Sequence, residues 1–110
     1  MNPRSIKRLE DARDACGRIQ AFTRGVSRDS FLASDLLRSA VERQLEIIGE
    51  ALGIAAKEHE TVQTHVPELR RIVALRNRLI HGYDSVDAEL VWDVVQTKIK
   101  PLMEQLEIVI

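Results

Sequence analysis

The chain has 110 residues, of which 45% are hydrophobic and 30% are charged, so it has the composition of one ordinary globular domain and not of a disordered chain. Sixteen Lys and Arg residues against seventeen Asp and Glu residues give a net charge of −1. No overall field therefore attracts the molecule to nucleic acid or anionic lipid, and any site for a polyanion has to be local. We expect a single domain over residues 1–110.

The chain has one cysteine, Cys16, which cannot form an internal disulfide. Its three histidines are scattered and show no metal-ligand spacing, so we expect no metal and no other cofactor. The most apolar stretch is short and carries Glu50, which argues against a membrane span and against membrane contact. The N-terminus has no apolar signal region, so a cytoplasmic location is expected.

The spacing of apolar residues is helical through most of the chain, and no run of alternating residues predicts a strand. The fold class expected is therefore all-α. Asn2 can cap a first helix that has Pro3 in its first turn, and Gly25 offers a left-handed stop, which together predict a helix over residues 3–24.

A second helix is predicted to start at Ser27 or Asp29, with Ser34 as a later alternative, and to run to about Glu58. Its apolar stripe is broad on both flanks, which makes dimerisation through this helix plausible. Residues 59–67 are expected to form a loop, because they are rich in Thr and Val, which are poor helix formers, and end in proline.

Pro67 is expected to open a third helix that ends at Ile80 or His81, with Gly82 as its left-handed stop. Asp84, Ser85 and Asp87 are turn or capping residues, and Asp87 is the expected cap of the fourth helix. That helix should turn Leu90, Val91, Val94, Val95 and Ile99 inward. Pro101 should kink or divide it. The expected architecture is an antiparallel up-down bundle of four to five helices.

Arg76 interrupts the apolar face of the third helix. At 100° per residue it falls inside the stripe that Leu69, Ile72, Val73, Leu79 and Ile80 form. A guanidinium there has to be paired, extended to the surface or pointed into a polar cleft. One interpretation is a structural ion pair with Glu46 or Glu50 of the second helix, and the other is a functional site.

His81 follows five residues after Arg76, so on one ideal helix the two side chains diverge by about 140°. They can converge only if the helix end unwinds near Gly82 or if a two-fold partner brings two such helices together. The alternative for His81 is an exposed residue that interacts with the helix dipole. His59 and His65 lie in the expected loop, and the sequence suggests for them only a similar exposed role without catalysis.

The segment 68–82 contains four arginines against one glutamate and so has a net charge of +3. It forms a local footprint for a polyanion, and Arg70, Arg71 and Arg78 are candidate contacts to RNA phosphates. Arginine and histidine together suffice for RNA cleavage without a metal. The histidine takes the proton of the 2′-hydroxyl that attacks the phosphate, and the arginine stabilises the added charge.

The string LRNRLIHGYDSVD at 75–87 resembles the motif of the HEPN superfamily, and more narrowly that of its HepT-like toxins: Arg, four residues, His, one residue, Tyr. Arg76, His81 and Tyr83 occupy the three places, and Asn77 is the polar neighbour of the arginine. AVERQLEIIGEAL at 40–52 and ELVWDVV at 89–95 are also similar to that family. The resemblance covers roughly residues 36–103.

The resemblance implies a helical homodimer in which the two motifs face each other near the symmetry axis. It further implies metal-independent RNA cleavage, with Arg76 and His81 catalytic and Asn77 orienting the site. Such toxins are paired with a minimal nucleotidyltransferase antitoxin that transfers AMP to the motif tyrosine, here Tyr83. The added charge and bulk would compete with RNA for the same cations.

Two other classes of protein stay open at this point. One is a catalytically silent helical module that assists a nucleotidyltransferase, and the other is a purely structural dimer. Loss of Arg76 or His81 would mark the silent module, and both residues are present. The sequence identifies neither the target RNA nor the stoichiometry with an antitoxin, and it assigns no role to Glu46, Glu50 or Asp84.

Overall fold

The computed structural model describes residues 1–82 and 86–110, and these residues form seven helices and no strand. The helices are α1 (Pro3–Thr23), α2 (Arg28–Ala33), α3 (Asp35–Glu58), α4 (Glu60–His65), α5 (Leu69–His81), α6 (Ala88–Thr97) and α7 (Ile99–Val109). The expected all-α helical bundle is confirmed. None of the helices in the described residues is long and apolar enough to cross a membrane.

The first helix starts and ends where its capping residues predict. The side chain of Asn2 accepts a hydrogen bond from the backbone N–H of Ser5 at 2.8 Å, which satisfies one of the free donors of the first turn. Pro3 occupies the first turn, and Gly25 has a φ of 72°, in the left-handed region that glycine tolerates best. The prediction for residues 3–24 is confirmed.

The predicted second helix is divided in two, because both of its candidate start signals are used. Ser27 caps α2 through the N–H of Ser30, and Ser34 caps α3 through the N–H of Leu37 at 3.1 Å. A single helix from Ser27 to Glu58 was therefore wrong, and the later start at Ser34 applies to the long segment. Phe31 of α2 is fully buried and holds the short helix on the core.

The expected loop at 59–67 is also wrong, because Glu60–His65 form α4. The local sequence disfavours a helix, but Val62 in α4 and Val66 just after it are fully buried, and α4 packs against α3 and α7. This burial outweighs the weak intrinsic preference. The next helix begins at Leu69, two residues after the start expected at Pro67.

The helix that carries the motif, α5, ends at His81 as predicted, but Gly82 is not its left-handed stop, since its φ is −141°. Among the described glycines only Gly25 has a positive φ. Asp84 and Ser85, the expected turn residues, lie outside the described residues. Asp87 caps α6 through the N–H of Glu89 at 2.9 Å, as predicted.

Pro101 divides the C-terminal helix. The break falls at Lys98, between α6 and α7, three residues before the proline. Proline has no N–H to donate to the carbonyl four residues earlier, here that of Thr97, which is the last residue of α6. The predicted division is confirmed, and its position follows from the missing hydrogen bond.

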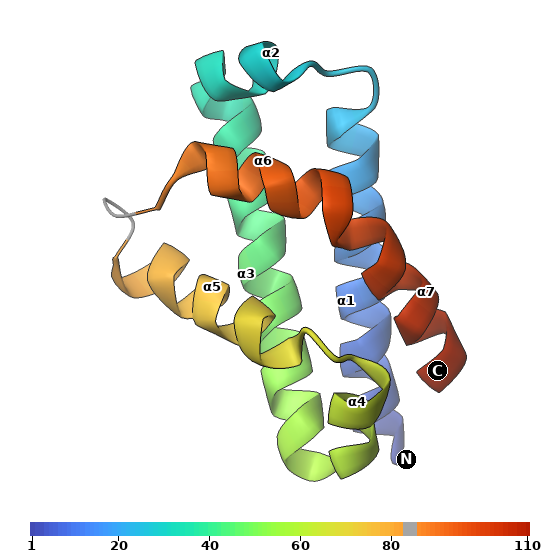
Figure 1. Cartoon of the computed structure of the whole chain (residues 1–110). Coiled ribbons are helices and arrows are strands. Elements are labelled where there is room, and N and C mark those ends of the chain that lie inside the picture. The colour runs from blue at the N-terminus through green and yellow to red at the C-terminus, as the bar shows by residue number, and fades with distance from the viewer. Residues whose placement is uncertain (83–85) are drawn as a thin grey trace.

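The core lies mainly between α1 and α3, which run side by side in opposite directions (Figure 1). α7 packs on α1, while α5 and α6 cross in front of α3 (Figure 1). The ring centroids of Phe31 in α2 and Trp92 in α6 lie 5.1 Å apart, so these two side chains connect the two helices. Fully buried residues of this core include Leu9, Ala12, Ile19, Val41, Ile48, Leu52 and Leu106.

Candidate active site

The buried face of α5 is what positions the motif. Leu69 and Leu79 are buried against the core, Ile72 is half-buried, and α5 packs across α3. Arg76 lies on this same face and is also half-buried, as its place in the apolar stripe predicts. A charged residue thus sits where the packing of α5 on α3 calls for an apolar one.

The guanidinium of Arg76 has only part of its hydrogen-bonding capacity satisfied. Nη1 donates to Oδ1 of Asn77 at 3.0 Å, so the structure brings these two predicted site residues together. Nε is buried and has no hydrogen-bond partner. A buried donor without an acceptor is uncommon, and a bound water, ion or ligand can account for one.

Arg76 forms no ion pair with Glu46 or Glu50, the structural alternative for this residue. Glu46 instead contacts Arg43, with Nη1 and Oε2 3.3 Å apart, and Glu50 is exposed. Within the described part of the chain, no carboxylate oxygen lies within 4.0 Å of the Arg76 guanidinium.

His81 lies apart from Arg76 within one subunit. It is the exposed last residue of α5, whereas Arg76 is on the buried face, and no hydrogen bond joins them in the described residues. Because α5 stays helical through His81, the end does not unwind to bring the two together. Of the two routes to convergence that the sequence left open, unwinding of the helix end before His81 is therefore not seen.

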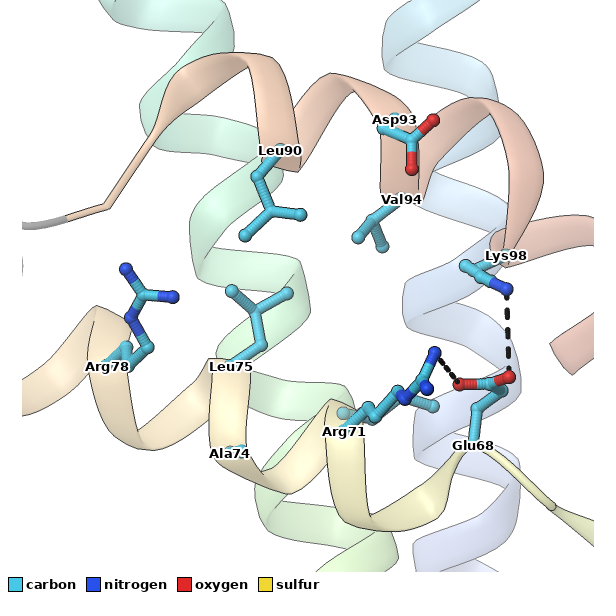
Figure 2. Close-up of a pocket in the computed structure, with 10 residues that line it drawn as sticks. Glu68, Arg71, Ala74, Leu75, Arg78, Leu90, Asp93, Val94 and Lys98 are labelled. Carbon is cyan, nitrogen blue, oxygen red and sulfur yellow. Dashed lines mark ion pairs between the residues drawn. The ribbon is translucent and has the colours of Figure 1, made fainter.

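Arg71 and Arg78 line a cleft of about 340 Å³ between α5 and α6. Figure 2 shows Leu75, Leu90 and Val94 pointing into it. Leu90 is 40% exposed here, so the expectation that it faces the core was wrong, whereas the half-buried Val94 packs against the core as predicted.

At one end of this cleft Glu68 forms ion pairs with Arg71 and Lys98, each at 3.6 Å (Figure 2). Arg70 is placed differently, in a separate open cleft together with Lys57, Gln63 and Val73. The three candidate phosphate contacts are thus divided between two sides of α5.

The other titratable and nucleophilic groups in the described part of the chain are relevant to two other kinds of site, a metal site and a cysteine nucleophile. No cluster of three or more His, Cys, Asp or Glu residues that could hold a metal ion is found among residues 1–82 and 86–110. Burial raises the pKa of the Cys16 thiol to about 12, so this cysteine is not a nucleophile at neutral pH. Tyr83, the predicted modification site, lies outside the described residues.

The chain is similar to known ribonucleases over nearly its whole length. Residues 12–109 match the family model described as "Ribonuclease HepT-like". A protein of Methanocaldococcus jannaschii named "Putative RNase MJ1380" is 33% identical over 99% of this chain and 100% of its own length. "Probable ribonuclease HepT" of Thermococcus cleftensis is 34% identical over 90% of this chain and 89% of its own length. No solved structure gives a significant match. The chain belongs to the HepT-like ribonuclease family.

Proposed function

We propose that this protein is a metal-independent endoribonuclease and the toxin of a toxin–antitoxin pair. Membership of a ribonuclease family supports the reaction class. The observation that carries the proposal is Arg76, a guanidinium on the buried face of α5 that has no carboxylate partner and a buried, unpaired Nε among residues 1–82 and 86–110. A partly buried charge without a partner is costly, and an RNA phosphate bound to Arg76 would offset that cost.

The reaction follows from what the two side chains can do. His81 takes the proton of a ribose 2′-hydroxyl, whose oxygen then attacks the adjacent phosphorus. Arg76 stabilises the charge that accumulates on the phosphoryl oxygens, while its hydrogen bond to Asn77 restrains the guanidinium. The bond between phosphorus and the 5′-oxygen breaks, the leaving oxygen takes a proton from water, and the upstream fragment ends in a 2′,3′-cyclic phosphate. His81 then releases the proton of the 2′-hydroxyl to water. No cofactor or metal takes part.

The active form is a homodimer in which Arg76 of one subunit works with His81 of the other. Support comes from the divergence of the two side chains on an intact helix, which a single subunit cannot overcome. Apolar side chains are also left exposed: Ile80 and Leu90 at 40% each and Leu36 at 83%. Ile80 stands directly before His81, where a subunit contact would bring the two motifs together.

RNA phosphates contact the exposed cations of α5. Arg71 and Arg78 line the cleft between α5 and α6, and Arg70 provides a separate positive charge on the other side of the helix. Arginine suits this role because its planar donors match phosphate oxygens. The contacts position the strand without reading its sequence.

The toxin is neutralised by a minimal nucleotidyltransferase antitoxin that transfers AMP to Tyr83. This tyrosine follows His81 by two residues in the sequence, so an attached adenylyl group adds negative charge close to the catalytic histidine. The proposed location is the cytoplasm, where the RNA substrate and the antitoxin are found.

The test is cleavage of labelled RNA by the purified protein in EDTA. We expect cleavage with a 2′,3′-cyclic phosphate or its hydrolysed product upstream and a 5′-hydroxyl downstream. RNA carrying 2′-O-methyl groups should be bound but not cut, because the nucleophile is blocked. A module that only assists a nucleotidyltransferase would leave both RNAs intact, and cutting of the methylated RNA would contradict the mechanism.

A further inference from the structure

Gly49 of α3 lies directly beneath Arg76 of α5. A Cβ atom placed on Gly49 would meet Cβ of Arg76 at 2.3 Å, Cγ of Arg76 at 2.8 Å and the carbonyl oxygen of Ile72 at 3.3 Å. Gly49 is itself buried. The absence of a side chain at this one position therefore allows α5 to lie as close to α3 as it does.

A side chain at position 49 would clash with Arg76, and no change in the rotamer of Arg76 would relieve this clash. The position of Arg76 Cβ is fixed by the α5 backbone, and carbon atoms in ordinary contact are about 3.5–4.0 Å apart. Any residue other than glycine at 49 would therefore push α5 away from α3 by more than about 1 Å at Arg76. Gly53, one turn later on α3, differs: its added Cβ would meet only Cγ2 of Val73, at 3.7 Å.

We propose that Gly49 is a positioning residue for the catalytic arginine: its bare α-carbon seats the first two carbons of the Arg76 side chain and so sets where the guanidinium lies. Nε, two bonds beyond Cγ in the same side chain, is itself buried. This inference rests on the proposed function in one respect, namely that Arg76 is catalytic. The packing of Gly49 against Arg76 does not depend on it.

The matched pair Gly49→Ala and Gly53→Ala tests the proposal, since both place one methyl group on the same helix. At a temperature where both are folded, we expect Gly49→Ala to lower the single-turnover cleavage rate by about 100-fold, the effect of a displacement of about 1 Å. Its affinity for 2′-O-methyl RNA should stay within about twofold of wild type, because the side chains of Arg70, Arg71 and Arg78 are exposed and take no part in the contact. Gly53→Ala should match wild type in both. A folded Gly49→Ala that cleaves at the wild-type rate would overturn the proposal.

Two measurements do not depend on cleavage. The ¹H–¹⁵N resonance of the Arg76 Nε–H should shift and exchange faster with solvent in Gly49→Ala but not in Gly53→Ala. Gly49→Ala should lower thermal stability in the wild-type background but not in Arg76→Gly, where the clashing carbons are gone. If Gly49→Ala fails to fold, Arg76→Gly should rescue its folding, and failure of that rescue would refute the contact. If wild-type protein cleaves no RNA, the proposed function fails. The resonance and the stability measurements still test whether Gly49 positions Arg76.

Discussion

Replacing Arg76 by methionine should lower the cleavage rate by about two to three orders of magnitude and at the same time stabilise the fold. Methionine keeps an unbranched stem over Gly49 but removes the charge and the buried Nε–H that has no acceptor. The two effects have opposite signs, which separates a residue kept for function from one kept for stability.

Both magnitudes follow from the state of the guanidinium. A buried donor without a partner costs about 1–3 kcal/mol. Since Arg76 is half-buried, we expect the gain in unfolding free energy to lie near the lower end, about 1 kcal/mol, or roughly 4 °C in melting temperature for a chain of this length. Loss of a group that stabilises transition-state charge lowers the rate by about 10²–10³-fold.

Urea unfolding at pH 7 and single-turnover cleavage of labelled RNA measure the two effects on the same preparations. Arg8→Met is the control, because Arg8 is exposed on α1, and its stability should stay within about 0.5 kcal/mol of wild type. The reasoning would be refuted if Arg76→Met lost more than about 1 kcal/mol of stability, which would show a structural charge, or if it cleaved RNA at the wild-type rate.

Three further predictions concern acid stability, regulation and assembly. A hydrogen bond from Ser5 Oγ at 2.6 Å holds the pKa of Glu58 below its usual value, so this contribution to stability is present above the unfolded pKa of about 4.3 and is lost as the pH falls through the lowered folded value. Glu58→Gln should therefore unfold at lower urea than wild type at pH 7, and the difference should close near pH 3; a difference independent of pH would contradict this. Tyr83→Phe should cleave RNA normally yet gain no AMP from the antitoxin and escape silencing; a Phe variant silenced as fully as wild type would point to occlusion. Light scattering should give about twice 12.5 kDa, and a fully active monomer at low concentration would exclude a shared site.

The parts of the fold that could be predicted are those that local chemistry decides. Asn2, Ser34 and Asp87 each satisfy a backbone N–H within three residues, and Pro101 breaks a helix through its own missing donor. α4 was missed because the burial of Val62 depends on α3 and α7, which no local pattern reveals.

The residues of the site likewise fall into those that the sequence could predict and those that it could not. The periodicity of α5 is sufficient to place Arg76 on the buried face and His81 on the exposed one. Gly49 could not be found this way, because its role depends on which turn of α3 passes under α5. The spacing of the two helices is a tertiary quantity, and a glycine within a helix gives no sequence signal of such a close approach.

The shared site is tested most directly by mixing two inactive variants. Arg76→Ala and His81→Ala homodimers should each fail to cleave RNA. After the two are unfolded together and refolded, about half of the dimers carry one of each chain, and one of their two sites then combines the intact Arg76 of one chain with the intact His81 of the other. We predict that cleavage in EDTA returns to about a quarter of the wild-type rate. A refolded mixture as inactive as its parents, although heterodimers are present by mass spectrometry, would contradict an Arg76–His81 site built from two subunits.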